Sequence, residues 1–271
     1  MADYKTSDGQ VFKGGEFGDS VARMDAESHQ RELDGRGSGG SSSSRITWTN
    51  GYKEKTYSNG DHYAGNFKEG LPHGKGKLTC KNGDVYEGDW VSDGNRGQMH
   101  GKGKMTYADG TVYEGDWVDG NRHGKGKMTW GGEWKGQVYE GDWIDDKRHG
   151  KGKCVFKDGS VYEGDWVDGK RHGKGKWKNA TGSFYEGDWA NDKPHGKGKY
   201  IWGQPKVCKE YEGGFFENQH HGKGKYILTD GRIFEGEFDR NTKIANGKIT
   251  YPNGKTETGT WDDVNDVFTK N

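Results

Sequence analysis

The sequence predicts an all-β protein, an elongated single-sheet antiparallel β-meander of about eight hairpin units. Three observations predict this fold: a short motif recurs along most of the 271 residues, apolar and polar residues alternate within it, and pairs such as Asp-Gly separate its copies. Only 28% of the residues are hydrophobic, whereas 13% are aromatic and 50 are Gly. We therefore expect a core made mainly of aromatic rings.

The repeated motif is Tyr-Glu-Gly-Asp-Trp, and looser copies lie towards both ends of the chain. Every copy except the last is followed by His-Gly-Lys-Gly-Lys, and successive copies start about 23 to 27 residues apart. Such self-similarity is typical of repeat proteins. The copies start at Tyr63, Tyr86, Tyr113, Tyr139, Tyr162, Tyr185, Tyr211 and Phe234.

Each unit is predicted to be a β-hairpin. In Val161–Val167 the Tyr, Gly and Trp share one face and the two acidic residues share the other, and in Gly173–Trp177 the lysines lie opposite the glycines and the Trp. Asp168-Gly169 is expected to link these strands, because such pairs accept positive φ. Similar pairs connect one unit to the next at Asn82-Gly83, Asp109-Gly110, Asp158-Gly159 and Asp230-Gly231.

The two faces of the sheet are expected to differ. Gly within a strand usually marks a close approach, so the glycines leave room for a ladder of rings along one face. On the other face, acidic residues lie across from lysines, and each such pair contributes about 0.2 to 1 kcal/mol. This pairing accounts for the equal numbers of basic and acidic residues, 42 and 42, without a ligand.

The motif Tyr-Glu-Gly-Asp-Trp, followed by Arg-His-Gly-Lys-Gly-Lys and an Asp-Gly turn, resembles the MORN (membrane occupation and recognition nexus) repeat. The resemblance covers residues 46–261 and implies an elongated antiparallel meander, found in scaffolding, ciliary and membrane-apposed proteins. Two strands per unit at about 4.8 Å each predict an array about 80 Å long.

Four segments are predicted. Residues 1–34 contain one strand similar to a repeat strand and a candidate short helix. Residues 35–45 form a Gly/Ser linker, residues 46–261 form the repeat array, and residues 262–271 form a C-terminal tail.

No enzyme, cofactor or metal site is predicted, because no catalytic constellation departs from the repeat. One His recurs per unit, about 10 Å from the next, too far apart to share a zinc ion, although protonation would make this surface more positive at mildly acid pH. The net charge of zero argues against nucleic-acid binding. Three cysteines without a CxxC pair, and no leader or long apolar run, predict an intracellular, cytoplasmic protein.

The leading hypothesis is a scaffold that binds helical or extended segments of partner proteins through its ring-lined face and its loops. The ring candidates could equally be plain core: Tyr86, Trp90, Tyr113, Trp117, Tyr139, Trp143, Tyr162 and Trp166. Loops lengthened relative to the repeat add the candidates Met99, Trp130, Trp134 and Trp202.

The resemblance further implies a ciliary or flagellar axoneme setting, such as the radial spoke head, whose components include similar all-MORN chains. The alternative function is a peripheral membrane-cytoskeleton tether whose Lys rows bind anionic phospholipid. A third hypothesis is self-association through the terminal strands, because an open sheet edge is a pairing template. The acidic run Trp261–Asp266 would weaken that pairing.

Overall fold

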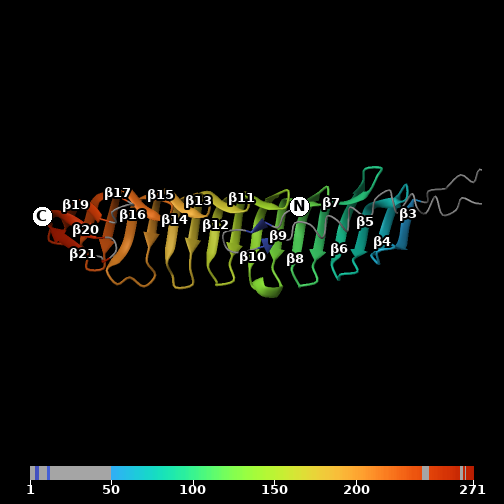
Figure 1. The fold of residues 1–271 in the computed structure, drawn as a ribbon, viewed down its shortest axis with the longest axis horizontal. Coiled ribbons are helices and arrows are strands. Elements are labelled where there is room, and N and C mark those ends of the chain that lie inside the picture. The colour runs from blue at the N-terminus through green and yellow to red at the C-terminus, as the bar shows by residue number, and fades with distance from the viewer. Residues whose placement is uncertain (1–3, 6–10, 13–49, 240–243, 263–264, 266) are drawn as a thin grey trace, which may run out of the picture. The chain divides into compact units, whose positions relative to one another are not determined.

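The computed structural model describes residues 4–5, 11–12, 50–239, 244–262, 265 and 267–271 (Figure 1). The chain divides into two compact units, Met1–Arg148 and His149–Asn271. In the described residues, all regular structure is β-strand apart from one short 3-10 helix, η1. The predicted all-β antiparallel meander is confirmed, whereas the helix and the linker expected within residues 13–45 lie outside the described residues.

In the first unit, strands β3 to β10 pair antiparallel in chain order. Their bounds are β3 Gly51–Thr56, β4 His62–Lys68, β5 Leu71–Thr79, β6 Val85–Ser92, β7 Gly97–Thr106, β8 Val112–Val118, β9 Asn121–Thr129 and β10 Val138–Ile144, with η1 at Gly132–Trp134. Two short strands, β1 Tyr4–Lys5 and β2 Val11–Phe12, pair with each other.

In the second unit, strands β12 to β21 also pair in chain order, and β11 pairs with β12. Their bounds are β11 Lys147–Val155, β12 Val161–Val167, β13 Lys170–Lys178, β14 Phe184–Ala190, β15 Lys193–Ile201, β16 Cys208–Phe216, β17 Gln219–Leu228, β18 Ile233–Phe238, β19 Ile244–Thr250, β20 Thr256–Asp262 and β21 Val267–Lys270. The sequence did not predict β21, because it carries no copy of the motif.

The turn at Asp168-Gly169, inside a hairpin, is built as the sequence predicts. Asp168 and Gly169 connect β12 to β13 with φ values of 48° and 83°. Asp145 and Asp146 take the same two places between β10 and β11 with φ values of 45° and 67°. Positive φ at both central residues is typical of a turn that matches the twist of the flanking strands. At the pairs that join units only the Gly has a positive φ: Asn82-Gly83, Asp109-Gly110, Asp158-Gly159 and Asp230-Gly231.

A bulge interrupts the pairing of the two strands in most hairpins, although β18 and β19 pair without one. Between β12 and β13, Gly164 lies opposite Gly175, but the next residue, Asp165, lies opposite His172. Gly173 and Lys174 therefore have no counterpart on β12, and Gly173 has a φ of 55°. Bulges increase bending and twist. We call the face with the Tyr and Trp rings the inner face and the face with the Glu, Asp and Lys residues the outer face.

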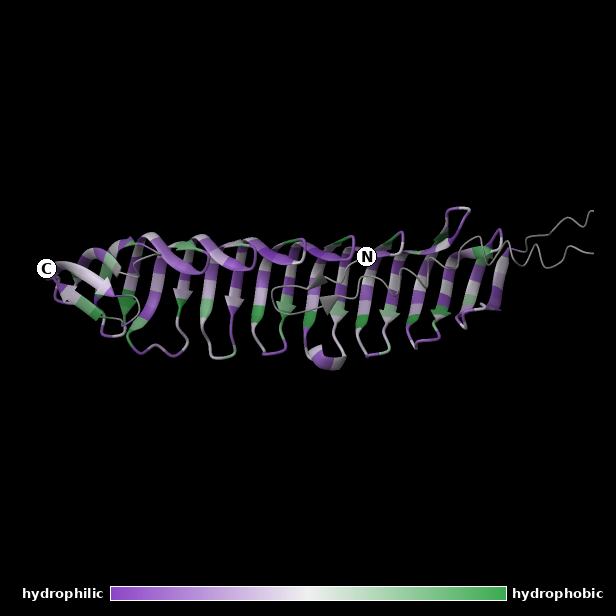
Figure 2. Cartoon of the chain, viewed as in Figure 1, coloured by the Kyte–Doolittle hydropathy of each residue, from purple (hydrophilic) through white to green (hydrophobic). Residues whose placement is uncertain are grey.

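The core consists mainly of rings on the inner face. Among the side chains that are almost fully buried, the twelve largest are all aromatic. They are Trp143, Trp166, Trp261, Tyr63, Tyr86, Tyr113, Tyr139, Tyr162, Tyr185, Tyr211, Tyr226 and Phe234. Figure 2 accordingly colours most strand residues purple or white and few of them green. Burial here rests on ring area rather than on aliphatic side chains.

Candidate functional site

The rings form a zigzag in which each meets the next edge to face, which we call the ring ladder. In the first unit, ring centroids lie 5.0 to 5.4 Å apart and ring planes are nearly perpendicular. The order is Phe67, Tyr63, Trp90, Tyr86, Trp117, Tyr113, Trp143 and Tyr139. In the second unit it is Trp166, Tyr162, Trp189, Tyr185, Phe215, Tyr211 and Phe238. Such edge-to-face pairs stabilise by about 0.5 to 1.5 kcal/mol beyond their burial.

The glycines of the repeat make room for these rings. A Cβ on Gly175 would lie 2.3 Å from the hydroxyl oxygen of Tyr162, and a Cβ on Gly164 would lie 2.5 Å from Gly175 Cα. The Tyr ring thus lies flat on a pair of glycines from neighbouring strands. The predicted packing role of the glycines is confirmed.

The polar atoms of the rings are bonded inside the sheet. The Tyr162 hydroxyl donates to the Asp165 carbonyl at 2.9 Å, and the Trp166 indole N–H donates to the Gly152 carbonyl at 3.0 Å. The same two bonds recur in other units, for example from Tyr86 and Trp90. These hydrogen bonds tie the rings of the ladder to the backbone of the strands that they cover.

The eight ring residues predicted to touch a partner are therefore packed as core. None of them is more than 3% exposed: Tyr86, Trp90, Tyr113, Trp117, Tyr139, Trp143, Tyr162 and Trp166. The sequence left open whether these rings are core or contact a partner, and in this structure they are buried. Partner contact with these rings stays a prediction that requires the sheet to open.

The lengthened loops differ in how much they expose. Met99 and Trp130 are buried, whereas Trp134, on η1, and Trp202, after β15, are half-buried. The Trp202 ring packs against Tyr200 at a centroid distance of 4.8 Å. Of the four loop candidates, Trp134 and Trp202 offer surface to a partner.

The outer face carries a row of ion pairs that we call the Lys–Asp row. The first Lys of one Gly-Lys-Gly-Lys segment pairs with the Asp of the next Tyr-Glu-Gly-Asp-Trp segment at 2.5 to 2.7 Å. The pairs are Lys75–Asp89, Lys102–Asp116, Lys125–Asp142, Lys151–Asp165 and Lys174–Asp188. The lysines remain largely exposed, so the row presents fixed charges to solvent.

Four Asp residues of this row, Asp89, Asp116, Asp165 and Asp188, also accept a hydrogen bond from a backbone N–H at the bulge. Asp165 accepts a hydrogen bond from the backbone N–H of Lys174 at 2.8 Å as well as from Lys151 Nζ. Burial opposes ionisation of Asp165, but these hydrogen bonds outweigh it and keep the pKa of the carboxyl below its usual value. The pKa of Asp188 is lowered in the same way, by Lys174 and the Lys197 N–H.

Arginines stacked on the rings are a feature that the sequence did not reveal, and of the two described next Arg122 is buried and Arg171 is half-buried. The guanidinium of Arg171 lies 4.6 Å from the Trp189 ring centroid and forms an ion pair with Asp192 at 3.1 Å. Arg122 stacks on Trp143 at 4.8 Å and pairs with Asp146 at 2.8 Å. Their position in the repeat could have indicated this, because the Arg before the repeated His lies directly opposite the Trp of its own hairpin, Arg171 opposite Trp166 and Arg122 opposite Trp117.

The repeated His residues lie beside turn carboxylates. His100 Nδ1 is 3.6 Å from Asp119 Oδ1, and His123 Nδ1 is 3.6 Å from Asp145 Oδ1. In the part of the chain that the structure describes, no group of three or more His, Cys, Asp or Glu residues is arranged to hold a metal ion. The effect of acid pH on partner binding stays a prediction.

The described residues also contain no helix long and apolar enough to cross a membrane. The three cysteines, Cys80, Cys154 and Cys208, are buried.

The hairpin units, their ring ladder and their glycine pairs define a β-repeat protein. The chain belongs to the MORN repeat family, which it matches over more than half of its length. The matching segments are residues 63–85, 95–112, 113–135, 139–161, 162–184, 185–204, 211–231 and 234–256. This family is a non-enzymatic repeat family.

No match was found among curated proteins. Among solved structures, the TCP10 domain of Danio rerio CPAP, in complex with a peptide of Danio rerio STIL, is 12% identical with a TM-score of 0.40. The alignment covers 82% of this chain and all of that one. The TCP domain of Drosophila melanogaster SAS-4, in complex with a Proline Rich Motif of Ana2, is 14% identical with a TM-score of 0.25, over 82% and 94% of the two chains.

Proposed function

We propose that this protein is a non-enzymatic scaffold that holds partner proteins through its outer face and its lengthened loops. MORN repeats belong to proteins that mediate protein or membrane interactions. The observation that carries the proposal is the Lys–Asp row, in which ion pairs and backbone hydrogen bonds keep charged groups at a fixed spacing. A surface ordered before binding loses little side-chain entropy when a partner docks.

The setting that we propose for this scaffold is a ciliary or flagellar axoneme, with the radial spoke head as the specific case. Its support is the resemblance of the sequence to all-MORN chains of that assembly. A periodic array suits a position where partners must be held at regular spacing.

Sequential extraction of native cells tests this function. Cells are treated with non-ionic detergent and then with high salt, and the protein is followed in each fraction. Retention through both steps is the result expected of an axonemal or scaffold component, and cross-linking then identifies its neighbours. Release by detergent alone would contradict the proposal.

A membrane tether through the lysines is the competing function. The lysines of the Lys–Asp row already have carboxylate partners, which reduces their attraction to anionic lipid. Attachment through the remaining lysines would weaken steeply with salt, because salt screens exposed charges. Co-sedimentation with anionic vesicles at low and high salt distinguishes the two functions.

A further inference from the structure

The second strand of each hairpin has one residue opposite a repeated Tyr or Phe ring, and the burial of this residue differs along the chain. On β13 and β15 it is Trp177 and Tyr200, and both are half-buried. In the other described hairpins it is at most 4% exposed, and the residues are Leu78, Met105, Met128, Cys154, Tyr226 and Ile249. Two neighbouring hairpins therefore present rings that the sheet does not fully cover.

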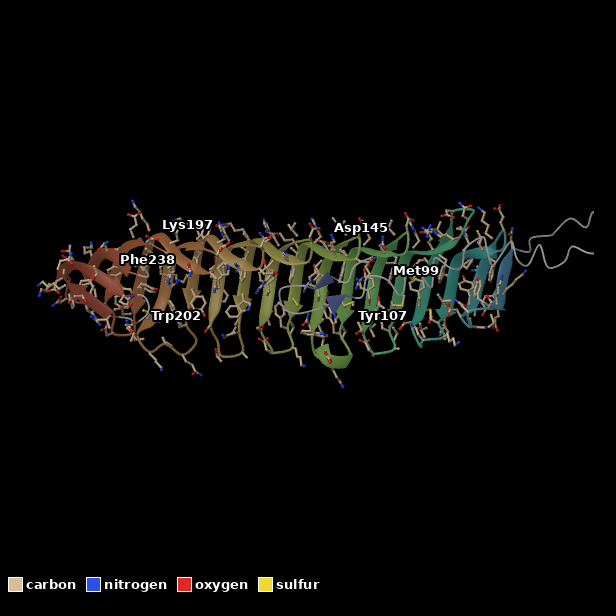
Figure 3. All side chains as sticks on the ribbon, in the orientation of Figure 1. Met99, Tyr107, Asp145, Lys197, Trp202 and Phe238 are labelled. Atoms are coloured by element: carbon tan, nitrogen blue, oxygen red, sulfur yellow. The ribbon has the colours of Figure 1, made fainter. Side chains whose placement is uncertain are left out.

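Trp202 adds a third half-buried ring beside Tyr200. It lies just after β15, and the two ring centroids are 4.8 Å apart. In Figure 3, Trp202 lies at the opposite end of this strand from Lys197. We call Trp177, Tyr200 and Trp202 the aromatic patch.

The neighbours of these rings are smaller than in other hairpins. Two residues beyond Trp177 the chain has Asn179, where the preceding hairpin has Phe156. Pro194 lies opposite Trp189, where other hairpins have a long Arg side chain. Fewer side-chain atoms are thus available to cover the patch.

The hydrogen-bond donors of the patch are not used inside the sheet. In the ring ladder, the Tyr162 hydroxyl and the Trp166 N–H both donate to backbone carbonyls. The Tyr200 hydroxyl and the indole N–H groups of Trp177 and Trp202 have no hydrogen-bond partner in the part of the chain that the structure describes. Tyr and Trp donors usually have a partner when they are buried, so a ligand that covers the patch has to supply acceptors.

Charged groups next to the patch are directed elsewhere. Lys178 and Lys199 adjoin the rings in sequence, but they point to the outer face because successive residues of a strand alternate. The Arg171 guanidinium, on the ring side of β13, is already paired with Asp192. The patch offers ring faces and neutral donors, which fit apolar side chains and backbone carbonyl groups.

We propose that the aromatic patch binds a proline-rich segment of a partner protein in the polyproline II conformation. Such a segment has no internal hydrogen bonds, so its carbonyl groups are free to accept. Aromatic-lined surfaces are a common receptor for it, because it is ordered before it binds. This inference rests on the proposed scaffold function and assigns a class of partner to the lengthened connection after β15.

The spacing of the rings matches the repeat of this conformation. Trp177 and Tyr200 lie on either side of Tyr185, two strands apart, which corresponds to about 10 Å. A polyproline II helix has three residues per turn and rises about 3.1 Å per residue, so prolines three apart lie on one side about 9 Å from each other. A segment that crosses β13 to β15 can place one Pro on each ring.

The experiment measures binding of a fluorescently labelled peptide to the purified full chain by anisotropy. The probe consists of Pro-Pro-Ala triplets with blocked ends, and the control peptide has Gly in place of every Pro. Trp177→Met should weaken binding of the Pro peptide about tenfold, as expected for a Trp near the centre of an interface. Tyr200→Phe should weaken it about fivefold, because one hydrogen bond is lost.

Trp134→Met is the matched control, because Trp134 is also half-buried but lies on η1 in the other compact unit. It should leave peptide affinity unchanged. Circular dichroism checks that the variants fold, as expected of Trp177→Met because Met105 and Met128 hold the same place in their hairpins. Equal losses for Trp134→Met and Trp177→Met, or equal binding of the Pro and Gly peptides, would overturn the proposal.

Salt and lipid separate this site from other kinds of binding. Peptide affinity should stay constant as salt is raised, because no ion pair takes part. A steep fall with salt would assign the binding to exposed lysines such as Lys206 and Lys209 and would overturn the proposal. So would binding of neutral phosphatidylcholine vesicles without binding of the Pro peptide.

The two proposals fail separately. Retention of the protein in the extracted cytoskeleton, with no Trp177-dependent peptide binding, would leave the scaffold function in place and remove only this docking site. Trp177-dependent peptide binding with release by detergent would do the reverse.

Discussion

The ring of Tyr162 occupies the space where a side chain on Gly175 would begin, because a Cβ there would lie 2.3 Å from the Tyr hydroxyl oxygen. The two residues lie on neighbouring strands, β12 and β13. Their contact determines how closely a ring can approach the sheet, and so how the sheet bends.

The first prediction follows from this contact. Gly175→Ala should lower the free energy of unfolding by about 1 to 3 kcal/mol, the usual cost of overpacking a core. The control is Gly169→Asn in the adjacent turn, where the equivalent residue Asn218 has a φ of 71°, and it should cost about 0.5 kcal/mol or less. Urea unfolding followed by tryptophan fluorescence measures both, and equal losses would show that ring packing is not the cause.

The second prediction concerns the hydroxyl of the same ring. Tyr162→Phe removes the donor to the Asp165 carbonyl and should cost about 1 kcal/mol while the fold is kept, because Phe234 fills the same position in a later unit beside Gly236 and Gly247. Tyr52→Phe, at a ring that is 68% exposed, should change nothing measurable. A Tyr162→Phe loss as small as that of Tyr52→Phe would contradict the assigned bond.

Much of this arrangement could be predicted from the sequence. The two-residue period placed the Tyr, Gly and Trp of Val161–Val167 on one face, and the Gly-rich strands indicated close ring packing. The bulge after Gly164 could not be predicted, because it depends on the register between two strands. The sequence likewise left open whether the rings are core or a contact surface, and only the structure shows that they are buried.

The sequence also left the polar part of the site incomplete. Nothing in the sequence singled out Arg171, since charge alone gives no sign that a guanidinium will stack on Trp189. The Gly at position 214, where most units have Asp, was visible in the motif, but the ion pair that such an Asp forms, as Asp188 does with Lys174, required the structure.

The third prediction is a pH dependence. The pKa of Asp165 is lowered in the folded chain relative to an unfolded value of about 3.9, so its contribution to stability is present above about pH 4 and is lost as the pH falls towards the folded pKa. Asp165→Asn should cost about 1 kcal/mol at pH 7, and the difference from the native sequence should shrink as the pH is lowered below about 4.

Urea unfolding at pH 7 and at pH 3 measures the effect of Asp165→Asn. Glu163→Gln, on the same strand and the exposed outer face, is the control and should cost about 0.5 kcal/mol or less at either pH. A loss for Asp165→Asn that stays constant between the two pH values would count against the ionised Asp as the cause.

The fourth prediction concerns the half-buried guanidinium of Arg171. Arg171→Lys keeps the charge but loses the planar stack on Trp189 at 4.6 Å and the bond from Nη2 to the Asp192 carbonyl at 2.9 Å, so it should lower stability by about 1 to 2 kcal/mol. Arg232→Lys, in an exposed pair with Asp230, is the matched control with a loss of about 0.5 kcal/mol or less. Equal thermal denaturation temperatures for the two variants would indicate that the stack adds nothing.

The last prediction concerns the edge of the first unit. In β3, Lys53 lies opposite Gly65 and Lys55 lies opposite Tyr63. In β5, the equivalent residues are Gly76 and Leu78, which lie opposite Gly88 and Tyr86. Inward-facing charges on an edge strand disfavour pairing with another chain. The double variant Lys53→Gly, Lys55→Leu restores the repeat pattern at this edge and should promote concentration-dependent association in sedimentation velocity, whereas the native sequence should not associate through β3. A Lys53→Gln, Lys55→Gln variant keeps the edge polar and should sediment as the native protein does. If this variant associates as strongly as the Lys53→Gly, Lys55→Leu variant, hydrophobic matching at β3 does not control the pairing.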